Sequence, residues 1–332
     1  MKRISKKGHS LEVPFYKSIS LRLIICFLIP VIGILVLGSV SYNSASKAII
    51  NSYKKSISQT VGMQQKYINL AVSSEIDEFK NYFTDSSLRT FFGGKMDIIE
   101  ASNLKKKYNS RLVSKLSVDE KAGGAYFIAD GGRSLQGGKA LLPADAYSAY
   151  METGQGAIVN ANPNDWLLFG QDKEADGVLG IDTQAYSVRI ARRFQGQDVC
   201  LIVDIDREFI RSVLASIDTG KGGCVVLVTS DGKEFYTEPG IEIKNTLIYG
   251  TEIYNKAVAA AEPTGNQMAV INGNESLFVY GKMETGNALV AAVIPSGRLL
   301  AETKEIKMVS FLLTAVFAIL ALILGLLISR KI

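Results

Sequence analysis

Two long apolar runs without a single charged residue lie near the two ends of this sequence. The first covers residues 23–43 and the second residues 308–329. A helix needs roughly 20 apolar residues to cross a bilayer, so both runs are long enough to form transmembrane helices. The apolar core of a cleaved signal peptide is shorter, at about 7–15 residues. We therefore predict an uncleaved anchor at 23–43, with a cleaved signal peptide as the alternative, and a second span within a helix over 298–328.

Basic residues cluster outside these two runs. Residues 1–22 contain six Lys or Arg against one Glu, and Arg330 and Lys331 follow the second run. Positive charge beside a membrane span favours the cytoplasmic side. The pattern predicts a cell-membrane protein with a cytoplasmic tail at 1–22, both termini in the cytoplasm and residues 44–307 outside. The net charge of +5 then reflects topology and does not indicate nucleic-acid binding.

A single apolar stripe follows the first span. Its members include Ile68, Val72, Ile76 and Phe79, at the three- and four-residue steps of a helix. Unbroken from 44 to 83, this helix would be about 60 Å long at 1.5 Å per residue. We assign residues 44–121 to a long stalk helix and a helical connection. The stripe is expected to pack partly on its own domain and partly on a second copy of the chain.

The region between the connection and the second span repeats one pattern. GGAYFIADGG (123–132) and GGCVVLVTSDGKEF (222–235) each place paired glycines, an apolar strand and an Asp-Gly turn in the same order. Each half closes with a strand that leads into a helix. Such repetition indicates two copies of one supersecondary unit. We predict an α+β fold with two small, mainly antiparallel sheets, at 122–217 and 218–297.

The residue inventory limits the chemistry. The sole histidine, His9, lies in the basic tail, so histidine-dependent nucleophilic catalysis and imidazole metal sites are not expected outside the membrane. Asp182, Asp204 and Asp206 leave a two-carboxylate hydrolase formally open, but the simpler interpretation is that Asp204 and Asp206 end a strand and cap the helix that starts near Arg207. We predict no enzyme activity, no metal and no cofactor.

Aromatic residues near the first sheet suggest a ligand pocket. The only tryptophan, Trp166, lies in a polar loop, and it is either a core side chain or the wall of a pocket of the usual mixed apolar and polar kind. Cys200 and Cys224 lie in separate strand-like runs and are either buried thiols or a disulfide pair. The predicted ligand-binding residues are Tyr126, Tyr147, Trp166, Phe169, Asp182, Tyr186 and Asp204.

This layout resembles the double Cache (dCache) sensor region of a bacterial methyl-accepting chemotaxis receptor. The resemblance rests on the order of basic tail, span, long helix, two PAS-like modules and second span, and on the closures VDIDREFIRSVL and VIPSGRLL. It implies that the membrane-distal module, 122–217, binds a small molecule, and that the membrane-proximal module, 218–297, relays the signal. It also implies a homodimer through the long helix and the transmembrane helices, with signalling by a small displacement of the last helix.

The resemblance extends to the end of the sequence but not to one ligand motif. Residues 329–332 look like the start of a HAMP linker, which implies a chemotaxis kinase complex or another cytoplasmic signalling module as partner. The alternatives are a sensor region of a histidine kinase or diguanylate cyclase, or a membrane-anchored envelope adaptor or enzyme. An amino-acid-binding subgroup carries Arg-x-Trp-aromatic, where this chain has Asn164-Asp165-Trp166-Leu167. Amino-acid sensing is therefore not implied.

Overall fold

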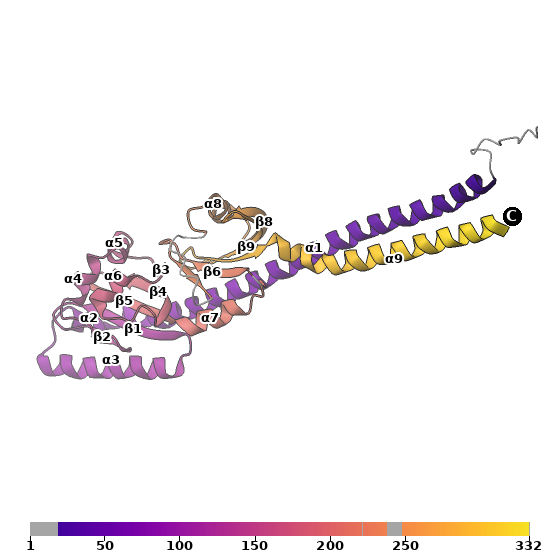
Figure 1. Ribbon diagram of the computed structural model, residues 1–332. Helices are drawn as coiled ribbons and strands as arrows, with labels where there is room; N and C mark the ends of the chain where they lie inside the picture. Colours follow the sequence, from indigo (N-terminus) through magenta and orange to yellow (C-terminus); the bar gives the residue numbers. More distant parts are fainter. Residues whose placement is uncertain (1–18, 221, 238–247, 332) are drawn as a thin grey trace, which may run out of the picture. The chain divides into compact units, whose positions relative to one another are not determined.

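A computed structural model describes residues 19–220, 222–237 and 248–331 (Figure 1). Residues 1–18 of the predicted cytoplasmic tail and Ile332 of the predicted HAMP start lie outside the described residues. The chain divides into two compact units: one comprises the residues up to Tyr53 together with those from Gly297 onward, and the other comprises Lys54–Ser296.

The first unit contains the start of helix α1 (Ile19–Thr84) and most of helix α9 (Ser296–Lys331). Within this unit the two helices approach at Gly38, where a Cβ would lie 3.1 Å from the Thr314 hydroxyl. Among the described residues, α1 alone is long and apolar enough to cross a membrane, whereas the apolar run in α9 covers only Phe311–Ala321. The second predicted span therefore stays a prediction.

The predicted long helix is confirmed, because α1 is continuous over 44–83. Its buried stripe includes Val61, Ile68, Val72 and Phe79, each with no exposed surface. The predicted helical connection consists of α2 (Ser86–Phe92) and α3 (Ile98–Val118). Asp85 and Asp97 cap these two helices by accepting hydrogen bonds from backbone N–H groups of the first turn.

The predicted repeat is confirmed as two antiparallel five-stranded sheets with the same connectivity. The strand orders are β2-β1-β5-β4-β3 and β7-β6-β10-β9-β8, so β1 corresponds to β6 and β5 to β10. The first sheet consists of β1 (Ala122–Ala129), β2 (Leu135–Gln136), β3 (Leu167–Phe169), β4 (Tyr186–Arg193) and β5 (Val199–Asp206). The second consists of β6 (Cys224–Val228), β7 (Glu234–Tyr236), β8 (Thr264–Ile271), β9 (Asn274–Lys282) and β10 (Leu289–Pro295). We call residues 122–217 the first module and residues 218–295 the second module.

Helices cover both faces of the first sheet, which explains why β5 is an almost continuous apolar run. On one face lie α4 (Ala146–Met151), α5 (Gly154–Ala161) and α6 (Lys173–Leu179), which share a core with Tyr126, Ile128 and Ile202. We call this the covered face. On the other face, Phe127 packs against Phe79 of α1 and Phe92 of α2. Helix α7 (Arg207–Ala215) follows β5 and leads toward the second module.

Helices α5 and α6 are not predicted by the sequence analysis. Both are short and contain glycine, and each depends on a cap: the Thr153 hydroxyl accepts from Gly156 N–H, and the Asp172 carboxylate accepts from the N–H groups of Glu174 and Ala175. In the second module, α8 (Glu252–Ala259) covers the sheet face that carries Phe278 and Ala291.

The two modules meet at the end of β3 and along α1. The hairpin between β9 and β10 places Gly286 so close to Leu168 that a Cβ would overlap the Leu168 side chain. Thr285 in the same hairpin is hydrogen-bonded to α1, because its N–H donates to Asn69 Oδ1 at 3.0 Å. The second module therefore contacts both the helix and the first module.

Candidate functional site

A buried ion pair lies on the covered face of the first sheet. Arg189 of β4 and Asp204 of β5 are directly opposite in the strand register, and Arg189 donates from Nε to Oδ1 at 2.7 Å and from Nη2 to Oδ2 at 3.0 Å. The Arg189 side chain has no exposed surface, and Asp204 is 3% exposed. Buried charges of this kind are found paired, because an isolated one is very costly.

A second carboxylate completes the coordination of the guanidinium. Asp176 of α6 is 1% exposed and lies 2.8 Å from Arg189 Nη2 through its Oδ1. The Tyr186 hydroxyl donates to both Asp176 oxygens at 3.0 Å, and the guanidinium carbon is 4.5 Å from the centre of the Tyr186 ring. One cation is thus held between two carboxylates and above an aromatic face.

Gln155 of α5, one of the helices on the covered face, contacts Arg189 as well. Its Oε1 accepts from Arg189 Nη1 at 3.5 Å and from the Tyr150 hydroxyl at 3.5 Å. Its Nε2 donates to the Gly170 carbonyl at 3.0 Å. We call the group formed by Arg189, Asp204, Asp176, Tyr186 and Gln155 the Arg189 cluster.

The environment keeps Arg189 cationic and the tyrosines protonated. Burial alone would lower the pKa of Arg189, but the facing Asp204 carboxylate outweighs it and holds that pKa well above its usual value. Burial raises the pKa of Tyr186. One guanidinium faces two carboxyl groups, and burial raises the pKa of Asp204, a rise that the Arg189 charge offsets only in part.

The Tyr126 hydroxyl lies beside this cluster. A Cβ at Gly124 or Gly138 would overlap this hydroxyl, so the two glycines make room for it. Tyr126 is 4% exposed, and burial followed by the Asp204 charge raises the pKa of its phenol. The two close glycine backbones thus set the position of the phenol between β1 and the segment after β2.

Most of the predicted site residues lie on the covered face. Tyr126, Phe169, Tyr186 and Asp204 are there together, with Phe169 opposite Arg189 in the β3–β4 register. Tyr147 of α4 shares the same core but lies near the other end of β4, where the Arg193 guanidinium is 5.9 Å from its ring centre. Burial raises the pKa of Tyr147 to about 12.

Trp166 does not share that face. Its ring meets Phe83 of α1 edge-on at 5.4 Å between centroids, and the Arg192 guanidinium is 4.9 Å from the ring centre. Because side chains alternate along β4, Arg192 lies on the α1 side of the sheet while Arg189 lies on the covered face. The predicted pocket that combines Trp166 with Tyr126 is therefore not formed in this structure.

The three candidate catalytic carboxylates do not converge. Asp182 is exposed, in the turn before β4, and its Oδ1 accepts from Gln184 N–H, so it also lies outside the Arg189 cluster. Asp206 caps α7 through the N–H groups of Glu208 and Phe209, as predicted, whereas Asp204 binds Arg189 instead of capping. Cys200 and Cys224 are thiols in different sheets and form no disulfide.

Sequence reasoning missed Asp176, Gln155 and the role of Arg189. Asp176 lies in a short helix beside Ala175 and Leu179, which are both buried. An acidic residue on such an apolar face is the signal that could have revealed it, because acidic side chains are almost never fully buried unless paired.

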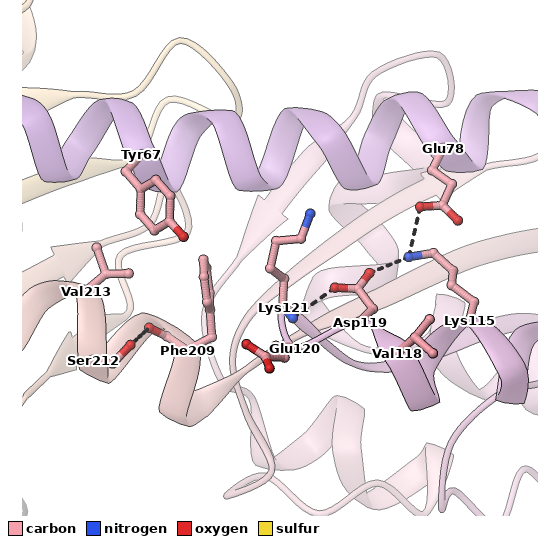
Figure 2. Close-up of a pocket in the computed structure, with 10 residues that line it drawn as sticks. All are labelled: Tyr67, Glu78, Lys115, Val118, Asp119, Glu120, Lys121, Phe209, Ser212 and Val213. Atoms are coloured by element: carbon pink, nitrogen blue, oxygen red, sulfur yellow. Dashed lines mark hydrogen bonds and ion pairs between the residues drawn. The ribbon is translucent and has the colours of Figure 1, made fainter.

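A hollow of about 640 Å³ lies on the α1 side of the first sheet (Figure 2). Figure 2 shows Tyr67 projecting from α1 toward Phe209 of α7, with Lys115 and Asp119 at the far end. The Lys115 ammonium lies 2.6–3.1 Å from carboxylates of Glu75, Glu78 and Asp119. Lys121 Nζ lies 3.4 Å from Glu75 Oε1 as well, so two lysines face three carboxylates at this end of the hollow.

Several solved structures resemble this fold. The ligand-binding domain of the Pseudomonas aeruginosa amino acid chemoreceptor PctB, in complex with L-Arg, is 13% identical, with a TM-score of 0.49 over 75% of this chain and 97% of that chain. The ligand-binding domain of the Pseudomonas fluorescens chemoreceptor CtaA, in complex with L-isoleucine, is 12% identical, with a TM-score of 0.46 over 79% of this chain and 98% of that chain. An extracellular domain named for the histidine kinase soHK1S-Z6 is 12% identical, with a TM-score of 0.49 over 77% of this chain and 98% of that chain.

At these identities the likeness concerns the fold alone. No protein-family profile matches the sequence, and no curated protein matches it. The predicted architecture of a dCache-type region, a long N-terminal helix carrying two tandem antiparallel sheets, is present in the chain's own elements.

Proposed function

We propose that this chain is the ligand-sensing region of a transmembrane receptor of the chemoreceptor type. The first module binds a small molecule on its covered face, and the second module and α9 pass the change toward the membrane. The observation that carries this proposal is the Arg189 cluster: a fully buried guanidinium with two carboxylates, beside the nearly buried side chain of Tyr126. A purely structural core has little reason to contain these groups, because apolar residues of similar volume are often equally or more stabilising.

The charge of the cluster supports one class of ligand. The two carboxylates outnumber Arg189, so a bound ammonium group would balance the site. The Tyr126 hydroxyl can donate to an acceptor on the same molecule. Small amines that also carry an acceptor, such as amino acids, combine both features. Entry requires α4–α6 or the Arg189 side chain to move, because the cluster is buried.

The helices at the two ends support a signalling role. α1 is long and apolar enough near its start to anchor the chain in a membrane, and α9 begins immediately after β10. We infer a cell-membrane location with both termini in the cytoplasm, a second span in α9, and a homodimer through α1. The signal in this proposal is a small displacement of α9, driven by a coupling free energy of about 1–3 kcal/mol, the usual size for two linked sites.

The output of this receptor has more than one candidate. A chemotaxis kinase complex is the partner we favour, and a histidine kinase or diguanylate cyclase attached to α9 is the alternative. Fusion of the chain to the signalling part of a chemoreceptor tests the link: insertion of two glycines after Lys304 should abolish ligand-dependent output while ligand binding persists. Unchanged output would contradict transmission through a continuous α9.

Binding is tested by thermal unfolding of the full chain in detergent with individual amino acids and simple amines. A ligand present at 100 times its Kd stabilises the folded state by about 2.7 kcal/mol, which is roughly 5–10 °C in Tm for a protein of this size. We expect at least one ammonium-bearing compound to produce such a shift.

Matched variants assign that shift to the covered face. Asp176→Asn and Tyr126→Phe should weaken the response, whereas Asp198→Asn, a mostly exposed carboxylate in the β4–β5 turn, should leave it unchanged. The proposal fails if no compound shifts Tm, or if the response survives both substitutions on the covered face.

A further inference from the structure

The backbone of Gly170 makes hydrogen bonds to residues of both modules. It follows β3 and is buried. Its carbonyl accepts from Gln155 Nε2 at 3.0 Å within the first module. Its N–H donates to both carboxylate oxygens of Asp231, in the β6–β7 turn of the second module, at 3.2 Å each.

The hydrogen bond to the Gly170 carbonyl fixes the orientation of the Gln155 side-chain amide toward Arg189. A Gln side chain donates only through its nitrogen and accepts only through its oxygen. Because Nε2 is used by Gly170, Oε1 faces Arg189 Nη1 and the Tyr150 hydroxyl, both at 3.5 Å. Gln155 is 2% exposed, so water does not readily replace either contact. A shift of Gly170 therefore changes the hydrogen bonding of Arg189.

Asp231 is itself held firmly. The Thr229 hydroxyl donates to it, and the turn is closed by the Thr229 N–H bond to the Lys233 carbonyl at 3.0 Å. The fit against Gly170 is tight, since a Cβ there would overlap the Lys233 Cβ and approach the Thr229 hydroxyl to 3.0 Å. Glycine is thus the residue that lets the turn reach the backbone of the first module.

We infer that Asp231 of the second module is a positioning residue for the Arg189 cluster of the first module, acting through Gly170 and Gln155. The signalling meaning of this contact rests on the proposed ligand site. Coupling between two sites is reciprocal, so a molecule that repositions Arg189 also acts on the β6–β7 turn. The second module is then part of the apparatus that shapes the binding site, in addition to any role as a relay.

Hydrogen exchange of the full chain in detergent tests this inference without any ligand. Asp231→Ala removes a hydrogen bond to a charged acceptor, of a kind that contributes about 1.5–3 kcal/mol. Even at the lower end, amide exchange should accelerate about tenfold in α5 (Gly154–Ala161) of the first module. Asp231→Asn keeps an acceptor for Gly170 N–H and should restore exchange in α5 to near the original rate. A merely local role for Asp231 would alter only the β6–β7 turn and would overturn the inference.

Two further variants separate this coupling from general destabilisation. Ser230→Ala, in the same turn, removes the bond from the Ser230 hydroxyl to the Leu168 carbonyl (3.3 Å) and leaves the Gly170 bond in place, so α5 should be unaffected. Gln155→Ala should accelerate exchange at residues 229–233 while the β8–β9 pair stays protected. If Asp231→Ala accelerates exchange everywhere, the Gln155→Ala result decides: no change at residues 229–233 refutes the coupling. Either result is independent of whether a ligand is found.

Discussion

The Arg189 guanidinium meets the Asp204 carboxylate through two parallel hydrogen bonds, at 2.7 Å and 3.0 Å, between neighbouring strands. Such a two-point contact fixes both side chains in direction as well as distance. It places the charge at the centre of the first module, where α6 and α5 add Asp176 and Gln155. The stability of the module should therefore depend on this pair.

Arg189→Met should lower the free energy of unfolding by about 3–5 kcal/mol, because it leaves buried carboxylates without a partner. Urea unfolding followed by the fluorescence of Trp166, the sole tryptophan, measures the change. Arg193→Met is the matched control, since Arg193 is on the same strand but pairs with the mostly exposed Asp198. An exposed pair contributes about 0–1 kcal/mol, and equal losses in the two variants would contradict a special role for Arg189.

Gly286→Ala should be more destabilising than Gly273→Ala, although both glycines have a positive φ, at 69° and 77°. The cost of the left-handed backbone, about 1–2 kcal/mol, is common to both. Only Gly286 faces Leu168 of the first module, whereas a Cβ at Gly273 meets nothing within 4 Å. We expect an additional loss of about 1–3 kcal/mol from overpacking at Gly286. Thermal unfolding of both variants measures it, and identical Tm values would mean that the modules can separate without cost.

Acid should weaken the cap of α2. Burial tends to raise the pKa of Asp85, but hydrogen bonds from Tyr108 and from the N–H groups of Ser87 and Leu88 outweigh it, and Lys107 adds to the lowering. A carboxyl group with a lowered pKa in the folded state stabilises above its unfolded pKa, about 3.9, and this contribution is lost as pH falls through the folded value. The wild-type Tm should therefore fall more steeply between pH 5 and pH 3 than that of Asp85→Asn, which keeps a capping side chain without a charge. Parallel slopes would show that Asp85 is not the group responsible.

Trp166→Ala should reduce stability without changing ligand affinity. The substitution removes the contact with Arg192 and the edge contact with Phe83, for a loss of about 2 kcal/mol from a half-buried aromatic residue. Thermal shift with any compound that binds the full chain separates the two effects: the baseline Tm should fall while the ligand-induced increment is retained. Loss of the increment would place Trp166 in the binding site.

Periodicity was enough to predict the elements that bury a large apolar area. The three- and four-residue steps of α1 and the apolar strands β1, β5, β6 and β10 are visible in the residue pattern, and the order of the two repeats led to the two sheets. The short helices α5 and α6 were missed because they bury few residues. Their formation depends on the caps at Thr153 and Asp172 and on packing against the sheet, which a local pattern does not contain.

The candidate site was only partly predictable for a related reason. The aromatic residues Tyr126, Phe169 and Tyr186, which the sequence analysis assigns to one pocket, belong to strands β1, β3 and β4 and lie on one face. The pairing of Arg189 with Asp204 depends on strand register, and a shift of one residue would send Arg192 to the covered face instead. Asp182, which the sequence analysis assigns to the pocket, lies in the turn before β4 and outside the Arg189 cluster. Trp166 contacts Phe83 of α1 and Arg192 on the other side of the sheet, an arrangement that a residue pattern without strand register does not contain.

One stretch of α1 serves as a wall for both sheets. Gln65 lies against Gly281 of the second sheet, and Phe79 packs on Phe127 of the first. Fourteen residues of helix separate these contacts, about 21 Å at 1.5 Å per residue. Anyone grafting one module onto another receptor must therefore transplant this helical segment as well. Inserting a single residue between the two contacts would rotate one of these side chains about 100° away from its sheet. Inserting seven residues, close to two full turns, would nearly restore the original direction of the side chain around the helix axis.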